Sequence, residues 1–177
     1  TASVCIPTCY VKQAADYMQG KIKVCTVIGF PNGNYTTATK VFETKDAIAN
    51  GADEIDMVIN VGMLKAKEYD YVLNEIKAIK EACDGRILKV IIETCYLTDE
   101  EKVEVCKCCM RAGADYVKTS TGFGTGGATV ADVKLMYDTV NPTCLVKASG
   151  GVKTKEDFEN MKKAGAMRIG TSSGTSL

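Results

Sequence analysis

The feature that most constrains the fold is a short phrase that recurs at three junctions of the sequence. Each copy follows a helix-like segment and leads directly into a β-prone segment: Gly51-Ala52-Asp53, Gly113-Ala114-Asp115 and Gly165-Ala166-Met167. Glycine ends helices because it adopts the left-handed conformation without steric cost. Predicted strands begin every ~20 to 35 residues, which is the spacing of βα units with right-handed crossovers. The sequence therefore predicts an α/β protein with a parallel sheet.

Hydrophobic periodicity predicts the elements themselves. Strands are expected over 2–6, 23–29, 54–60, 88–95, 115–118, 145–151 and 168–172. Helices are expected over 9–19, 36–50, 66–83, 98–113, 129–140 and 154–164, the fourth opening on a capping box at Thr98 and Glu101. A (βα)8 TIM barrel or an open doubly wound sheet could follow. Polar residues on the inner strand faces favour the barrel, although a barrel of this type has one strand more than is predicted here.

Composition excludes several classes of protein. The 177 residues are 46% hydrophobic and 25% charged, which suits one domain spanning 1–177 with its own core. Basic and acidic residues are equal at 22 each, so we expect no nucleic-acid partner. The sequence has neither an apolar run of membrane-spanning length nor a signal-peptide pattern. We therefore expect no membrane contact and a cytoplasmic location.

The absence of histidine removes Ser-His and Cys-His nucleophile pairs and histidine-ligated metal sites. Lysine, carboxylate, tyrosine or thiol chemistry remains. Among the nine cysteines, only Cys106 and Cys109 have CxxC spacing, and no second pair completes a metal site. We expect reduced structural thiols and no metal. Cys5 is a partial exception, because the end of its predicted strand would lie near a reactive mouth where a thiol could meet aldehydes.

A lysine stands out in the stretch DYVKTSTGFGTGG at 115–127. Lys118 ends a β-prone run, and a loop rich in hydroxyl groups and glycine follows it. Alternation places Tyr116, Lys118 and Ser120 on one face of the strand. This arrangement suits amine chemistry on a phosphorylated substrate, although a solvated lysine at a strand end is the simpler interpretation of this stretch alone.

Further candidate residues are predicted at other strand ends, which meet at one face of a parallel barrel. Lys147 follows in the next strand, and repulsion between two ammonium groups is expected to lower the pKa of Lys118. Asp56 is the carboxylate available to move protons or orient a lysine, and an acid that only balances two inward lysines is the alternative. Turns after the last two strands predict a phosphate site at Gly150, Gly151, Gly170, Ser172 and Ser173.

Six segments resemble the 2-deoxyribose-5-phosphate aldolase family: VCTVIGFPNG, EIDMVINVGMLK, LKVIIETC, DYVKTSTGFGTGGAT, VKASGGVKT and RIGTSS. The resemblance implies a metal-free, cofactor-free class I aldolase on a (βα)8 TIM barrel. It also implies a Schiff-base lysine at Lys118, a pKa-lowering partner at Lys147 and a proton-relay acid at Asp56. The implied phosphate contacts are Gly122, Gly150, Gly151, Gly170, Ser172 and Ser173.

The implied reaction is the reversible cleavage of 2-deoxy-D-ribose 5-phosphate to D-glyceraldehyde 3-phosphate and acetaldehyde, in deoxyribonucleotide catabolism. The implied partners are therefore a phosphorylated sugar and acetaldehyde, and a homodimer is left open. Two alternatives remain: a non-catalytic phosphosugar-binding fragment, and another class I aldolase or a transaldolase. Members of the family carry a further first strand and helix and a further last helix. We therefore expect a chain trimmed or proteolysed at both ends.

Overall fold

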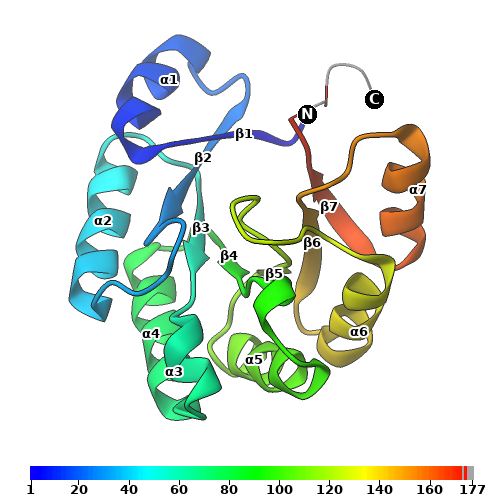
Figure 1. Ribbon diagram of the computed structural model, residues 1–177. Coiled ribbons are helices and arrows are strands. Elements are labelled where there is room, and N and C mark those ends of the chain that lie inside the picture. Colours follow the sequence, from blue (N-terminus) through cyan, green and yellow to red (C-terminus); the bar gives the residue numbers. More distant parts are fainter. Residues whose placement is uncertain (173, 175–177) are drawn as a thin grey trace.

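The computed structural model describes residues 1–172 and 174, and seven parallel strands in it form one curled sheet (Figure 1). Each strand pairs with the next one in sequence, in the order β1 to β7. The strands are β1 Ser3–Ile6, β2 Lys23–Ile28, β3 Glu54–Val58, β4 Ile87–Ile91, β5 Tyr116–Lys118, β6 Leu145–Ser149 and β7 Ala166–Gly170. The predicted parallel α/β architecture of the barrel type is confirmed.

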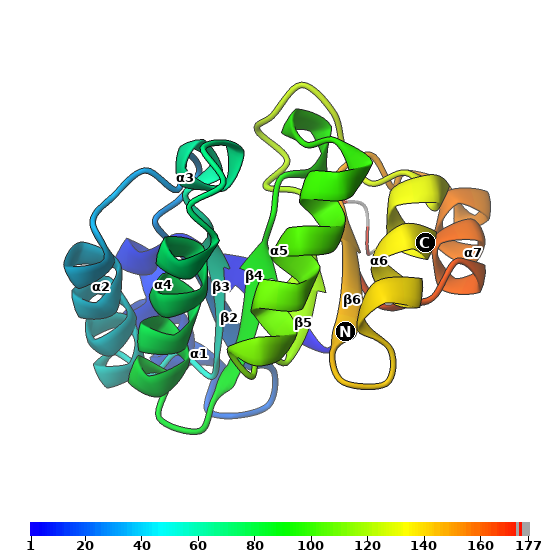
Figure 2. The same ribbon diagram turned by 90° about the horizontal axis from the view of Figure 1, so that it is seen from below.

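Helices cover the outer, convex face of this sheet (Figures 1 and 2). They are α1 Val11–Met18, α2 Thr37–Ala49, α3 Val61–Lys65, α4 Tyr69–Ala82, α5 Asp99–Arg111, α6 Val130–Val140 and α7 Lys155–Lys163, with 3-10 turns η1 Thr8–Tyr10 and η2 Thr94–Tyr96. The predicted capping box is present, because the Thr98 side chain accepts from Glu101 and the Glu101 side chain accepts from Thr98. None of the described helices is long and apolar enough to cross a bilayer.

The recurring glycine phrase joins each helix to its strand by a repeated set of contacts. Its glycines have φ values of 105°, 73° and 113°, which only glycine adopts readily: Gly51, Gly113 and Gly165. In the first two copies the aspartate then accepts a 2.8 Å hydrogen bond from the start of the preceding strand, Asp53 from Val24 and Asp115 from Leu88. The phrase thus ends a helix and also fixes the register of two neighbouring strands.

Several predicted boundaries were wrong near the carboxyl ends of the strands. β3 stops at Val58 because the Asn60 side chain caps α3, and β4 stops at Ile91 because Glu93 has a φ of 53°. The helix predicted over 66–83 corresponds to α4, which begins three residues later, and α3 was not predicted; Lys67 lies between the two with a φ of 63°. The last strand begins two residues earlier than predicted, at Ala166. Backbone that was expected in strands therefore forms loops at this end of the sheet.

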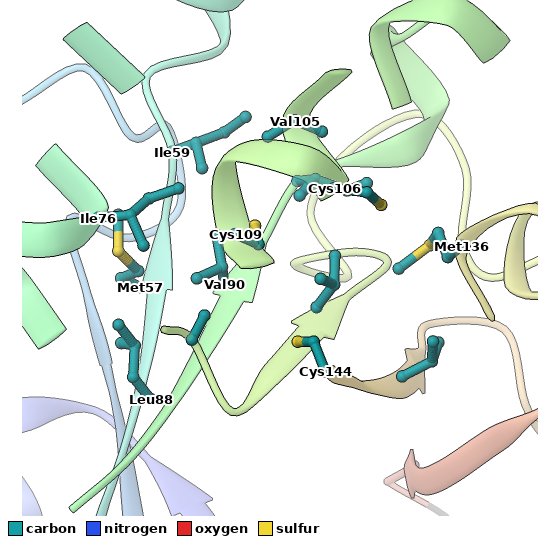
Figure 3. Close-up of a cluster of buried hydrophobic side chains, with 14 of the residues drawn as sticks. Met57, Ile59, Ile76, Leu88, Val90, Val105, Cys106, Cys109, Met136 and Cys144 are labelled. Carbon is teal, nitrogen blue, oxygen red and sulfur yellow. The ribbon is translucent and has the colours of Figure 1, made fainter. Parts of the chain in front are cut away.

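Alternate residues of the strands serve two different environments. Residues such as Met57, Leu88 and Val90 point outward and pack against the helices in a continuous apolar core (Figure 3). Cys106 and Cys109 belong to this core, where burial raises the pKa of both thiols, that of Cys106 to about 12. All nine cysteines are unpaired, as the structural-thiol prediction requires. The intervening strand residues face the concave side, which carries the polar groups.

Candidate active site

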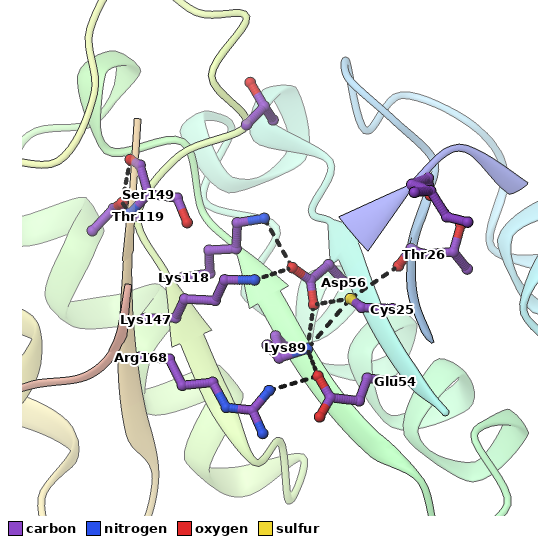
Figure 4. A network of polar contacts seen from close by, with 12 residues as sticks. Cys25, Thr26, Glu54, Asp56, Lys89, Lys118, Thr119, Lys147, Ser149 and Arg168 are labelled. Atoms are coloured by element: carbon purple, nitrogen blue, oxygen red, sulfur yellow. Dashed lines mark hydrogen bonds and ion pairs between the residues drawn. The ribbon is translucent and has the colours of Figure 1, made fainter. Parts of the chain in front are cut away.

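Three lysines converge on one carboxylate on the concave side of the sheet (Figure 4). Asp56, in β3, is fully buried. Its Oδ2 accepts hydrogen bonds from Lys118 Nζ at 2.8 Å and Lys147 Nζ at 2.9 Å, and its Oδ1 accepts one from Lys89 Nζ at 2.7 Å. Lys118 and Lys147 are register partners in β5 and β6. The structure therefore brings together the three residues for which the sequence predicted catalytic roles, and it adds Lys89.

The charges of this cluster keep it ionised. Burial alone would raise the pKa of Asp56, but the charges of Lys118, Lys147 and Lys89 lower it well below its usual range. For Lys118 the two effects have the opposite signs. Burial alone would lower its pKa, but the adjacent Asp56 carboxylate raises the pKa above its ordinary value. The net shift of the Lys118 pKa is therefore upward, opposite to the lowering expected from Lys147. The intervening carboxylate outweighs the repulsion between the two ammonium groups.

Two further charged residues, Glu54 and Arg168, extend the cluster beyond Lys89. Lys89 Nζ also lies 2.7 Å from Glu54 Oε2, and the same oxygen accepts a 2.6 Å hydrogen bond from Arg168. Arg168 stacks over the ring of Tyr116, with its guanidinium carbon 5.2 Å from the centroid. Burial would raise the pKa of Glu54, but Arg168 and Lys89 lower it.

Sequence reasoning missed Lys89 and Arg168 as members of the cluster. The sequences of β4 and β7 contained the signal, because Lys89 interrupts the apolar run of a buried strand and Arg168 stands between apolar residues of a partly buried one. The polar face predicted for β3, which carries Glu54 and Asp56, is confirmed.

The loop after β5 is held at the mouth of the site by Glu93. Its carboxylate accepts a hydrogen bond from Thr121 N at 3.2 Å and a short one from the Thr121 hydroxyl. A Cβ on Gly124 would lie 2.9 Å from Cys95 Sγ and 3.1 Å from Glu93 Cδ, so a larger residue there would displace these side chains. Phe123 packs edge to face on Phe30, and a cavity of about 110 Å³ opens between these segments. Glu93 was not among the site residues predicted from the sequence.

The glycines predicted to hold phosphate lie after β5, after β6 and at the last residue of β7. Gly150 and Gly151 have φ values of 83° and 79°, and Gly170 pairs with Ser149 in the sheet. A Cβ on Gly170 would lie 2.6 Å from Ser149 Oγ, and one on Gly122 would meet nothing within 4 Å. Among the described residues, the buried hydroxyls of Ser120 and Ser149 have no hydrogen-bond partner. Ser172 is exposed just beyond β7, and Ser173 lies outside the described residues.

Comparisons with known proteins agree on one family. The model of the DeoC/LacD aldolases, described as "DeoC/LacD family aldolase", matches residues 1–176. A deoxyribose-phosphate aldolase of Clostridioides difficile is 59% identical over 97% of this chain and 78% of its own length. The structure of a putative deoxyribose-phosphate aldolase from Coccidioides immitis superposes with a TM-score of 0.96 at 46% identity, covering 99% of this chain and 71% of the other.

A tetrameric deoxyribose phosphate aldolase of Aeropyrum pernix is more distant. It superposes with a TM-score of 0.91 at 31% identity, over 98% of this chain and 74% of its own. These likenesses extend over nearly the whole sheet and its helices, so they also support the barrel-type fold. On the family match and the sequence identity together, this chain belongs to the DeoC/LacD aldolase family.

Proposed function

We propose that this protein is a deoxyribose-phosphate aldolase, a carbon–carbon lyase that cleaves 2-deoxy-D-ribose 5-phosphate through a Schiff base on Lys118. The observation that carries the proposal is the pair of lysines on one carboxylate oxygen, with Lys118 and Lys147 both within 2.9 Å of Asp56 Oδ2. A nucleophilic amine beside a group that exchanges protons is what Schiff-base catalysis requires. The names of the relatives support the substrate.

The reaction follows from this arrangement in a fixed order. Lys118 Nζ, once deprotonated, attacks the aldehyde carbon of the open-chain sugar, and loss of water leaves an iminium ion. The bond between the second and third carbons then breaks, its electrons move into the iminium, and the hydroxyl on the third carbon loses its proton. Glyceraldehyde 3-phosphate leaves. The remaining enamine takes a proton on carbon, and water releases acetaldehyde and regenerates the amine.

Asp56 and Lys147 are the groups placed to move these protons. Lys118 must first lose its own proton, and Asp56 Oδ2 is its nearest acceptor at 2.8 Å. Lys147 Nζ contacts the same oxygen at 2.9 Å, so a proton can pass between the two amines through the carboxylate. In this scheme Lys147 acts as a proton relay that also keeps Asp56 ionised while Lys118 is neutral.

The phosphate of the substrate is assigned to the end of β7 and to the loops after β5, β6 and β7. Gly122, Gly150, Gly151, Gly170 and Ser172 offer backbone and hydroxyl donors there, and Ser173 completes the predicted set outside the described residues. The unpartnered hydroxyls of Ser120 and Ser149 support a polar ligand near these strand ends. Binding at exposed backbone N–H groups suits an anion.

The experiment is reductive trapping. The protein is incubated with acetaldehyde and borohydride, digested and mapped by mass spectrometry, beside Lys118→Ala and the matched exposed-lysine variant Lys107→Ala. We expect an ethyl adduct at Lys118 in the native chain and in Lys107→Ala. The loss of cleavage in Lys118→Ala should be at least ~10³-fold, because the covalent route is gone.

Two other outcomes would redirect the proposal. A folded protein that binds deoxyribose phosphate without forming an adduct would be a phosphosugar-binding module. An adduct combined with faster cleavage of ketose phosphates than of deoxyribose phosphate would indicate another class I aldolase or a transaldolase. Comparing initial rates on the two substrate classes distinguishes these cases.

The remaining assignments are the cellular location, the partners and the assembly of the enzyme. We assign it to the cytoplasm, which the nine unpaired thiols support because disulfides are rare there. Its substrates are small phosphorylated sugars and acetaldehyde, and the equal numbers of acidic and basic residues argue against nucleic acid. A homodimer is the assembly proposed, and sedimentation velocity would test it.

A further inference from the structure

Two cysteines lie side by side at one end of the lysine cluster. Cys5 in β1 and Cys25 in β2 are register partners on adjacent parallel strands. Cys25 Sγ donates to Asp56 Oδ1 at 3.2 Å and accepts from Lys89 Nζ at 3.5 Å, so it faces the concave side. The Cys5 sulfur, the Cys25 sulfur and an Asp56 oxygen all lie within 4.8 Å of one another. The proposed reaction scheme uses neither thiol.

The positions of the two strands suit a covalent bond between these sulfurs. Adjacent strands lie ~4.8 Å apart, and disulfides join residues whose Cα atoms are ~4.4 to 6.8 Å apart. Because Cys5 and Cys25 are direct partners in the ladder, the sulfurs can approach by side-chain rotation, without a shift of either strand. Cys5 is exposed and can meet a small oxidant, whereas Cys25 is fully buried and next to it.

The surrounding charges favour a thiolate over a bound cation. Four basic side chains in the cluster face only two carboxylates: Lys89, Lys118, Lys147 and Arg168 against Glu54 and Asp56. This excess of positive charge opposes a divalent metal at the two sulfurs and Asp56. The pKa of Cys5 falls to about 7, chiefly because a Cys5 thiolate can accept the Cys25 S–H in place of Asp56, while that hydrogen bond and burial raise the pKa of Cys25. Cys5 is therefore the attacking sulfur.

We propose that Cys5 and Cys25 form a peroxide-sensitive thiol pair that closes to a reversible disulfide beside Asp56. In the first step the Cys5 thiolate attacks one oxygen of hydrogen peroxide, the O–O bond breaks, and the departing hydroxide takes up a proton to leave as water. The product is a sulfenic acid on Cys5. Cys25 then attacks that sulfur and displaces a second water, so two thiols are oxidised and one peroxide is reduced.

Asp56 links this bond to the chemistry of the site. The reduced Cys25 donates a hydrogen bond to Asp56 Oδ1, and the disulfide has no S–H to donate. Loss of a bond to a charged group weakens the control of Asp56 over its lysines. This consequence rests on the proposed function, and we expect oxidation to lower aldol cleavage roughly tenfold. Formation of the disulfide itself does not depend on that function.

The test is peptide mapping after brief treatment with stoichiometric hydrogen peroxide and alkylation of the remaining thiols. Trypsin separates the two cysteines into the peptides 1–12 and 24–40. We expect these peptides to be joined, with the mass of two hydrogens lost, and to separate again in dithiothreitol. Cys5→Ser and Cys25→Ser should abolish the link. Cys9→Ser is the matched control, since Cys9 is exposed and shares the first peptide with Cys5.

Three results would contradict the proposal that Cys5 and Cys25 form a disulfide. The first is oxidation of Cys5 to sulfinic acid while Cys25 remains free and is alkylated. The second is a link between the peptides that disappears in Cys9→Ser. The third is the absence of any link. Cys5 is exposed, so Cys5→Ser should fold even if Cys25→Ser does not, and circular dichroism checks both. In a second readout, peroxide should lower cleavage by the native chain, reversibly, and leave Cys5→Ser at its own untreated rate. If the disulfide is mapped but peroxide does not lower the cleavage rate, the disulfide proposal stands and only its proposed effect on catalysis is contradicted.

Discussion

Two buried lysine–carboxylate contacts in this molecule behave in opposite ways. On the concave face, Asp56 is surrounded by lysines, and its pKa falls well below the ordinary range. On the helical side, Lys40 and Glu75 form an isolated pair 2.9 Å apart, and both side chains are 0% exposed. There burial lowers the pKa of Lys40 and raises that of Glu75, so each group is pushed toward neutrality. One lysine does not compensate for the burial of a carboxylate, whereas three do.

The isolated pair is structural. Lys40 in α2 donates to the carbonyl of Val58 at 2.8 Å, and Glu75 in α4 accepts from Asn60 N at 3.3 Å. The pair therefore fastens two helices to the end of β3, directly beyond Asp56. The comparison separates a lysine that holds the scaffold from lysines that keep a reactive centre charged.

Asp56→Asn removes the charge on which the cluster depends and should have the largest effect. We expect kcat to fall ~10² to 10⁴-fold, because proton transfer is lost while the amide can still accept from the lysines. The pKa of Lys118 should fall as well, since the Asp56 carboxylate is the main group that raises it. The pH profile of adduct formation with acetaldehyde would then shift to lower pH.

Glu54→Gln is the matched control for this change, because it alters the same network through Lys89 and leaves the Lys118–Asp56 contact intact. An Asp56→Asn profile that coincides with that of the native chain would show that Asp56 does not govern Lys118.

Lys40→Met tests the structural pair. Breaking a buried pair by removing one partner costs ~3 to 5 kcal/mol of unfolding free energy. We expect a cost near the lower end of this range. The pKa of Glu75 is already raised, so its carboxyl can take up a proton when Lys40 is absent. Urea denaturation measures the change, and activity per folded molecule should stay near that of the native chain.

Two variants calibrate that result. Asp138→Ala breaks the exposed Lys134–Asp138 pair and should cost less than ~1 kcal/mol. Replacing both Lys40 and Glu75 by apolar residues should recover part of the loss. A Lys40→Met cost no larger than that of Asp138→Ala would mean that the buried pair does not stabilise the fold.

The pH dependence of adduct formation is the finest test of the reactive cluster. The pKa of Lys118 is raised above the ordinary lysine value of 10.5, so the amine is mostly charged at neutral pH. Because only the neutral amine attacks, the initial rate with acetaldehyde should rise about tenfold per pH unit between pH ~7 and ~9. A plateau below pH ~9 would restore the sequence-based expectation that Lys147 lowers this pKa.

Local signals explain how much of the fold could be predicted. The glycine phrase, the Thr98 capping box and the alternation in β3 act over a few residues, and each predicted its element correctly. Boundaries failed where a side chain or an unusual backbone angle intervened, as at Asn60 and Glu93. The short helix α3 at 61–65 was not predicted at all.

The sequence by itself determined the order of the strands and of the longer helices, and the inward face that carries Asp56, Lys118 and Lys147. Only the tertiary structure decided which charges meet. Asp56 contacts Lys118 across 62 residues and Lys147 across 91, and Arg168 reaches Glu54 across 114. Such contacts depend on the register and curl of the whole sheet, whereas periodicity reports only which way each residue faces. The sign of the Lys118 pKa shift follows from the same fact, because it is set by where the carboxylate lies between the two lysines.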